Sequence, residues 1–168
     1  MAIFSVYGPC QIPVSKKPKA RLISEDLSPF WERHEEVASS KGCYIFAIRA
    51  GRGFTPLYVG KTTDTFKTEC FTPSKLEHYH RALADYIKGT PVLFFIVHPP
   101  NQGATNRKAI TQIEDFLIQA GRMVNPNLRN IRGGRLPKWG IKGVIRAGQG
   151  GISESEKQFR RLMGIKKQ

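Results

Sequence analysis

The stretch that decides the fold is residues 42–62, GCYIFAIRAGRGFTPLYVGKT. It holds two segments rich in β-branched and aromatic residues, CYIFAIRA and TPLYVGKT, joined by GRGF. The two glycines of GRGF can adopt the backbone conformations that a tight turn needs. The pattern predicts two strands, near 43–50 and 56–61, that pair as an antiparallel hairpin.

A helix and a strand are predicted directly after this hairpin. Thr72 followed by Pro73 is a typical helix start, and apolar residues recur at helical spacing until Lys88 and Gly89, which predicts a helix over 73–88. The run PVLFFIVHPP is continuously apolar and bounded by prolines, which is typical of a strand covered on both faces. We expect a central strand of the sheet near 92–98.

The clearest helical pattern covers residues 106–120. Its apolar stripe is closed by Gly121 and consists of Ala109, Ile110, Ile113, Phe116, Leu117 and Ala120. Residues 122–151 are rich in Gly, Asn and Arg, which predicts a loop with a candidate short strand at 143–145. The segment 153–163 begins acidic and ends basic, as a helix dipole favours, so a terminal helix is expected there.

The N-terminal part has weaker patterns. Residues 3–14 are interrupted by Pro9 and Pro13, so any strand there is short or lies at a sheet edge. Ser28 with Pro29 predicts a helix start, and the helix is expected to continue toward Ser40.

These elements predict an α/β protein of the α+β type, with one domain in 168 residues. We expect an N-terminal extension (1–40), a domain with a three-stranded antiparallel sheet flanked by helices (41–131), and a basic C-terminal extension (132–168).

The composition indicates the kind of partner. Hydrophobic residues make up 40% of the chain, which excludes a disordered tail protein, and no apolar run is long enough to span a membrane. The three cysteines are far apart, so no disulfide framework is expected and a reducing cytoplasm fits best. Lys and Arg number 27 against 13 Asp and Glu, and the resulting charge of +14 favours a polyanion, which we expect to be nucleic acid.

One basic segment is a candidate nucleic-acid contact. Between Arg129 and Arg146 it holds no acid, and Trp139 among its basic residues could stack on a base. The other basic residues of the segment are Arg132, Arg135, Lys138 and Lys142.

Two tripeptides in the hairpin, Gly42-Cys43-Tyr44 and Tyr58-Val59-Gly60, resemble the signature tripeptides of the GIY-YIG nuclease family. The resemblance continues through Lys61-Thr62, the predicted helix, the apolar third strand, and Glu114 in the pattern E-x-x-L-I. It ends with the sequence NPNLRN at 125–130.

The resemblance implies a compact module that hydrolyses nucleic-acid phosphodiester bonds, expected to be DNA, with one Mg²⁺ or Mn²⁺ ion. Glu114 would hold the metal, since it lies at the edge of the apolar stripe, whereas Asp115 should face solvent. Tyr44 would accept or relay a proton once nearby cations lower its pKa, and Tyr58 would orient water or phosphate. Gly60 would allow a close backbone approach.

The sequence departs from the family where an arginine usually begins the helix after the second tripeptide, because no arginine occurs between Arg52 and Arg81. Lys75, four residues before Tyr79, could replace it, and Lys67 is the rival.

Other assignments by resemblance involve Asn130, which would hold the glutamate or the phosphate, with Asn127 as the competing alignment. Lys61 and His78 are expected phosphate contacts. His78 and His80 lie two residues apart, so they cannot chelate one metal on a helix, and His98 should be structural.

The sequence leaves two hypotheses about function. The first is a metal-dependent endonuclease. The second is a nucleic-acid-binding module that keeps the fold but cleaves little, and the missing arginine favours this second hypothesis.

Overall fold

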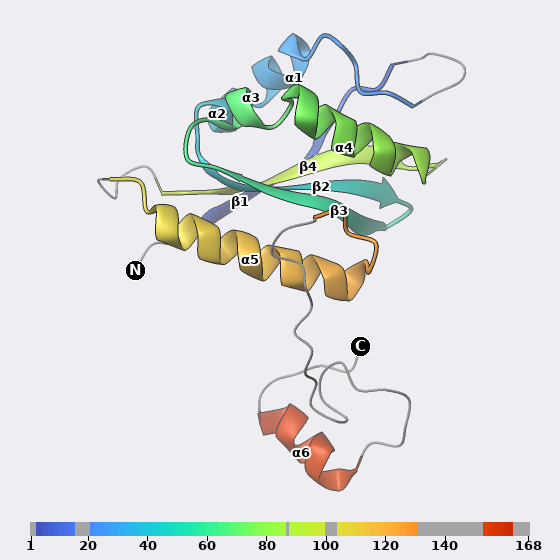
Figure 1. The fold of residues 1–168 in the computed structure, drawn as a ribbon, viewed down its shortest axis with the longest axis vertical. Helices are drawn as coiled ribbons and strands as arrows, with labels where there is room; N and C mark the ends of the chain where they lie inside the picture. Colours follow the sequence, from blue (N-terminus) through green and yellow to red (C-terminus); the bar gives the residue numbers. More distant parts are fainter. Residues whose placement is uncertain (1–2, 16–20, 87, 100–103, 131–152, 163–168) are drawn as a thin grey trace. The chain divides into compact units, whose positions relative to one another are not determined.

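Figure 1 shows the computed structural model of the chain, which describes residues 3–15, 21–86, 88–99, 104–130 and 153–162. The chain divides into two compact units, Met1–Gly134 and Arg135–Gln168. In the second unit the predicted terminal helix is confirmed as α6 (Glu154–Leu162). Ser153 and Glu156 bond to each other's backbone N–H groups at its start, a capping box.

The first unit is built on one antiparallel sheet of four strands in the order β1-β4-β2-β3. The predicted hairpin is confirmed as β2 (Gly42–Ala50) and β3 (Gly53–Thr62), with Gly51 at a φ of 58° in the turn. The predicted central strand is confirmed as β4 (Thr90–Val97), which pairs with β1 on one side and β2 on the other.

The prediction of three strands is wrong because β1 (Ser5–Gln11) adds a fourth. Pro9 does not prevent this pairing, since β1 is an edge strand and its register shifts between Tyr7 and Cys10. The expectation that any strand in this region lies at an edge is confirmed.

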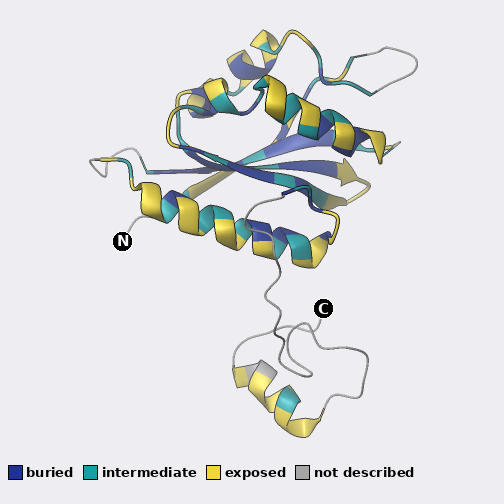
Figure 2. Cartoon of the chain, in the orientation of Figure 1, coloured by how far each residue is buried: buried dark blue, intermediate teal, exposed yellow. Residues whose placement is uncertain are grey.

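Helices cover both faces of the sheet (Figure 1). One face carries α1 (Ser28–Arg33), α2 (Glu35–Ala38), α3 (Phe66–Glu69) and α4 (Pro73–Ala84). The other face carries α5 (Arg107–Val124), which turns its exposed side away from the sheet in Figure 2. No helix of the described ranges is long and apolar enough to cross a membrane.

Strand β2 separates two parts of the core because successive side chains point to opposite faces. Tyr44, Phe46 and Ile48 belong to the large cluster on the side of α1 to α4. Cys43 packs with Ile96 and Ile110 on the side of α5. All three cysteines of the chain are free and buried.

Two helix ends differ from the prediction, and in both cases the glycine expected to end the helix has another role. Helix α5 continues past Gly121 to Val124. A Cβ on Gly121 would lie only 3.3 Å from the Leu128 side chain, so this glycine allows close packing and does not end the helix. Helix α4 ends at Ala84 and not at residue 88. Gly89, with a φ of 105°, instead leads into β4 and packs on Ile48.

The predicted helix from Ser28 to Ser40 is two short helices, with the break at His34. The residue that precedes α1 as its cap is Leu27, and Ser28 is already inside the helix. Helix α3 was not predicted, although Thr65 caps it by accepting a hydrogen bond from the backbone of Thr68. The candidate strand at 143–145 lies outside the described residues.

Candidate active site

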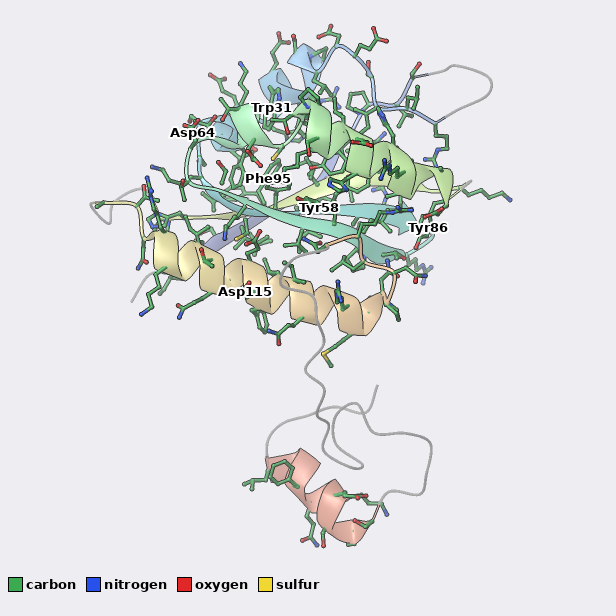
Figure 3. The ribbon with its side chains drawn as sticks, viewed as in Figure 1. Trp31, Tyr58, Asp64, Tyr86, Phe95 and Asp115 are labelled. Atoms are coloured by element: carbon green, nitrogen blue, oxygen red, sulfur yellow. The ribbon has the colours of Figure 1, made fainter. Side chains whose placement is uncertain are left out.

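The candidate site is a cavity of about 700 Å³ along the outer edge of β3, between α4 and α5, and we call it the edge groove. It is polar and bears charges of both signs. Figure 3 labels two of its residues, Tyr58 on β3 and Asp115 on α5. Its lining residues come from β3, α4, α5 and the segment after α5, and are Tyr58, Lys61, Ser74, Lys75, His78, Glu114, Asp115, Ile118, Arg129 and Asn130.

Strand β3 supplies the groove from both of its faces. A register shift between Phe46 and Ala47 leaves Leu57 as an extra residue in β3. After this bulge, Tyr58 packs against the core on the α4 side, whereas Val59 packs on the α5 side. Because β3 is an edge strand, side chains on its two faces can meet around that edge.

Tyr58 is held by two side chains of α4. Lys75 Nζ donates a hydrogen bond of 3.0 Å to the Tyr58 hydroxyl oxygen. The imidazole of His78 stacks on the Tyr58 ring at a centroid distance of 5.3 Å and an interplanar angle of 15°. The hydroxyl therefore has a fixed position, and its own proton remains free to be donated into the groove.

Lys75 has a second partner, Glu69 of α3, at 3.3 Å. Burial lowers the pKa of Lys75, but the hydrogen bonds and charge interactions with Tyr58 and Glu69 outweigh burial, so its pKa is raised and it remains a cation. Lys67 lies away from the groove, in a depression beside α1 that also contains Phe71. Of the two rival lysines, the structure brings Lys75 to Tyr58.

Glu114 lies on α5 with its carboxylate in the groove, where Oε2 is 2.8 Å from Lys61 Nζ. Its side chain is 19% exposed and that of Lys61 is 35% exposed. Lys61 also donates a hydrogen bond of 3.1 Å to Thr111, three residues before Glu114 on the same helix. Asp115 lines the rim and is exposed, as predicted.

Tyr44 and Tyr79 do not line the groove, and both are fully buried behind it. Burial is the largest cause that raises the pKa of each, so the expectation that cations lower the pKa of Tyr44 is wrong. The two phenols are close enough to affect each other's pKa, yet within the described residues neither hydroxyl has a partner with good hydrogen-bond geometry.

The close approach expected at the Gly60 backbone is confirmed, and the group that approaches it is the Tyr44 ring. Gly60 lies opposite Tyr44 in the β2–β3 pairing. A Cβ on Gly60 would lie 2.2 Å from Cζ of the Tyr44 ring, so that ring occupies the space that a side chain would need. The glycine of the second tripeptide is therefore explained by the tyrosine of the first.

Asn130 lines the groove but directs its amide at the backbone of β3. Its Oδ1 accepts a bond of 2.8 Å from the Val59 N–H, and its Nδ2 donates to the Val59 carbonyl at 2.6 Å. Asn127, the competing alignment, lines a neighbouring depression and not the edge groove. Of the two asparagines, the structure therefore brings Asn130 to the groove, in contact with the edge strand.

Among the described residues, the other basic residues and histidines singled out from the sequence contact different parts of the structure. The Arg129 guanidinium bonds to Asp85 and to the Arg81 carbonyl at the end of the groove. His80 accepts a hydrogen bond from the Ile23 N–H. His98 accepts one from the Asn106 N–H, so the prediction that His98 is structural is confirmed. The remaining basic-segment residues lie outside the described residues: Arg132, Arg135, Lys138, Trp139, Lys142 and Arg146.

The donor set of the groove fits one magnesium-like ion held by one protein carboxylate. Mg²⁺ commonly keeps several waters and binds through one or two carboxylates plus substrate phosphates. Glu114 supplies such a carboxylate in the groove, where Lys61 pairs with one of its oxygens. Among the residues that the structure describes, no group of three or more His, Cys, Asp or Glu is placed to enclose a metal completely.

Two residues that support the groove were missed by sequence reasoning. Glu69 anchors Lys75, but it belongs to α3, which was not predicted; the Thr65 cap followed by Thr68 was the available signal. Ser74 lines the groove at the start of α4, and nothing in its sequence context distinguishes it from an ordinary first-turn serine.

Comparisons of the chain with models of protein families, with curated proteins and with solved structures found no match.

Proposed function

We propose that this protein is a divalent-metal-dependent endonuclease of the GIY-YIG type that hydrolyses phosphodiester bonds of nucleic acid, with DNA as the expected substrate. The observation that carries the proposal is the edge groove itself. It brings Tyr58, Lys75 and Glu114 together from three different elements of the fold. A fixed hydroxyl, an ammonium and a carboxylate that can hold a metal are groups that metal-dependent phosphodiester hydrolysis uses.

Tyr58 and Lys75 act as one unit on the substrate. The ammonium stays charged because its pKa is raised, and it can stabilise the negative charge that develops on a phosphoryl group. Tyr58 accepts from Lys75, so its own O–H can orient a phosphate oxygen or the attacking water. We assign the contact with substrate to Tyr58 and a supporting role to the buried Tyr44.

Glu114 is the residue that would hold Mg²⁺ or Mn²⁺. A bound divalent ion supplies Lewis acidity to the phosphate and a lower pKa to its water. Arg129 lies at the end of the groove, and the sequence that follows it is rich in Lys and Arg without an acid up to Arg146, a composition that suits contact with a nucleic-acid backbone. The overall charge of +14 supports the same choice of substrate.

The test is cleavage of plasmid and of end-labelled single-stranded DNA by the full-length protein, with Mg²⁺ or Mn²⁺ against EDTA. We expect cleavage only with metal, and Glu114→Gln should lower the rate by at least about 100-fold because it removes the metal ligand. Glu32→Gln is the matched control, since Glu32 is an exposed glutamate on α1, away from the groove. A Glu114→Gln protein that cuts at the parental rate would overturn the assignment.

The second candidate is a nucleic-acid-binding module without significant cleavage. Two observations favour it: the tyrosine of the first tripeptide is buried, and the Glu114 carboxylate is already paired with Lys61. In the same assay this candidate predicts no cleavage with either metal, together with DNA binding that weakens steeply as salt rises.

A further inference from the structure

The ion pair between Lys61 and Glu114 occupies the place where a cation would bind the carboxylate. The separation of 2.8 Å is that of a charge-assisted hydrogen bond. Thr111 gives the same ammonium a second acceptor at 3.1 Å, so Lys61 is held at two points on α5. The Glu114 side chain is only 19% exposed, which limits screening of the pair by water.

The other described cations of the groove have different partners. Lys75 is bound to Tyr58 and Glu69, and Arg129 is bound to Asp85. Neither needs to move for a metal ion to reach Glu114. Lys61 differs from both because its ammonium contacts the one carboxylate that the proposed function needs.

We propose that Lys61 is a built-in competitor for the metal, which keeps Glu114 neutralised until a nucleic-acid phosphate offers the ammonium another anion. This inference rests on the proposed function, because it takes Glu114 as the metal ligand. A divalent ion on Glu114 would repel the Lys61 ammonium, which contacts Oε2 of the same carboxylate, so the metal and Lys61 compete for one negative charge. The flexible four-carbon stem of lysine allows the ammonium to move away without a change in the backbone of β3.

The exchange couples the metal to the substrate. A phosphate in the groove draws Lys61 away from Glu114 and thereby strengthens metal binding, and by linkage the metal strengthens phosphate binding by the same factor. Free enzyme would hold Mg²⁺ weakly and the complex with nucleic acid would hold it more tightly. Lys61 is thus a positioning residue that loads the metal when substrate is present.

The experiment is a titration of the ¹⁵N-labelled full chain with Mg²⁺ alone, at constant ionic strength, followed by the backbone amide shifts of Glu114 and its neighbours. Lys61→Met removes the competing charge, and we expect the half-saturating Mg²⁺ concentration to fall by at least about threefold. Lys61→Arg keeps the charge and should stay close to wild type. Lys75→Met removes a groove charge that does not contact Glu114, and its effect should be below about twofold.

Glu114→Gln distinguishes the competition by Lys61 from the role of Glu114 as the metal ligand. If Lys61→Met and wild type bind Mg²⁺ equally and Glu114→Gln abolishes the shifts, competition by Lys61 is overturned while Glu114 stands as the metal ligand. If no variant shows Mg²⁺ shifts that depend on Glu114, both the competition and the metal-dependent function are overturned. Preserved amide spectra in the absence of metal verify that each variant is folded.

Discussion

The two outer edges of the sheet are closed in different ways. At the β1 edge the strand ends the sheet, and Val6 remains 69% exposed. At the β3 edge the segment after α5 lies against the strand: Asn125 bonds to the Pro56 carbonyl, Arg129 N–H to the Leu57 carbonyl, and Asn130 to both backbone groups of Val59. A segment that satisfies backbone groups without forming a strand leaves room beside β3 for a groove.

The difference shows why the candidate site lies at one edge and not at the other. At the β3 edge, backbone groups of Pro56, Leu57 and Val59 are bonded by the segment after α5, and charged side chains of both signs line the groove between α4 and α5. At β1 the exposed side chains include the aliphatic Val6 and the aromatic Tyr7.

The largest effect is expected where β3 meets the core at Gly60. Gly60→Ala places a Cβ 2.2 Å from the Tyr44 ring, and Tyr44 is fully buried and cannot move aside. We expect a loss of more than about 4 kcal/mol in the free energy of unfolding, measured by urea denaturation. Gly53→Ala is the control in the same strand, because its Cβ would have no heavy atom nearer than 3.9 Å and should change stability little.

The closure of the β3 edge depends on Asn130. Asn130→Ala leaves the Val59 N–H and carbonyl without their partners, which should lower the free energy of unfolding by about 3 kcal/mol. Ser5→Ala, a comparable truncation on the exposed β1 edge, should cost below about 0.5 kcal/mol. Equal losses in the two variants would show that the two edges are not closed differently.

The two tyrosines of the tripeptides should differ in activity. Tyr58→Phe removes the hydroxyl that Lys75 holds in the groove, and we expect the cleavage rate to fall about tenfold, equivalent to about 1.4 kcal/mol in the activation barrier. Tyr44→Phe removes a buried hydroxyl that has no hydrogen-bond partner in the described part of the chain, so rate and stability should stay near wild type. A greater loss of rate with Tyr44→Phe would return the proton-transfer role to Tyr44.

The hairpin, β4 and α5 were predictable because their hydrophobic patterns agree with their turn and cap residues. Helix ends were less predictable, since Gly121 serves packing against Leu128, a contact that sequence spacing does not reveal. The pairing of β1 was missed because a proline-containing edge strand has no clear alternation.

The candidate site was also predictable only in part. Tyr58, Lys75 and Glu114 were singled out from the sequence, and the structure brings them to one groove. The burial of Tyr44 and the pairing of Lys61 with Glu114 were not predictable, because both depend on which side chains the sheet and α5 bring together in space.

The most direct test of the edge groove as the nucleic-acid site is an amide-shift map of the ¹⁵N-labelled chain titrated with a short single-stranded DNA in EDTA. Binding in the groove predicts that the largest shifts among the described residues occur at Tyr58 to Lys61, along α4 near Lys75 and His78, and around Glu114 on α5. The β1 edge should remain unchanged. Shifts confined to β1, with the groove signals unmoved, would contradict the account.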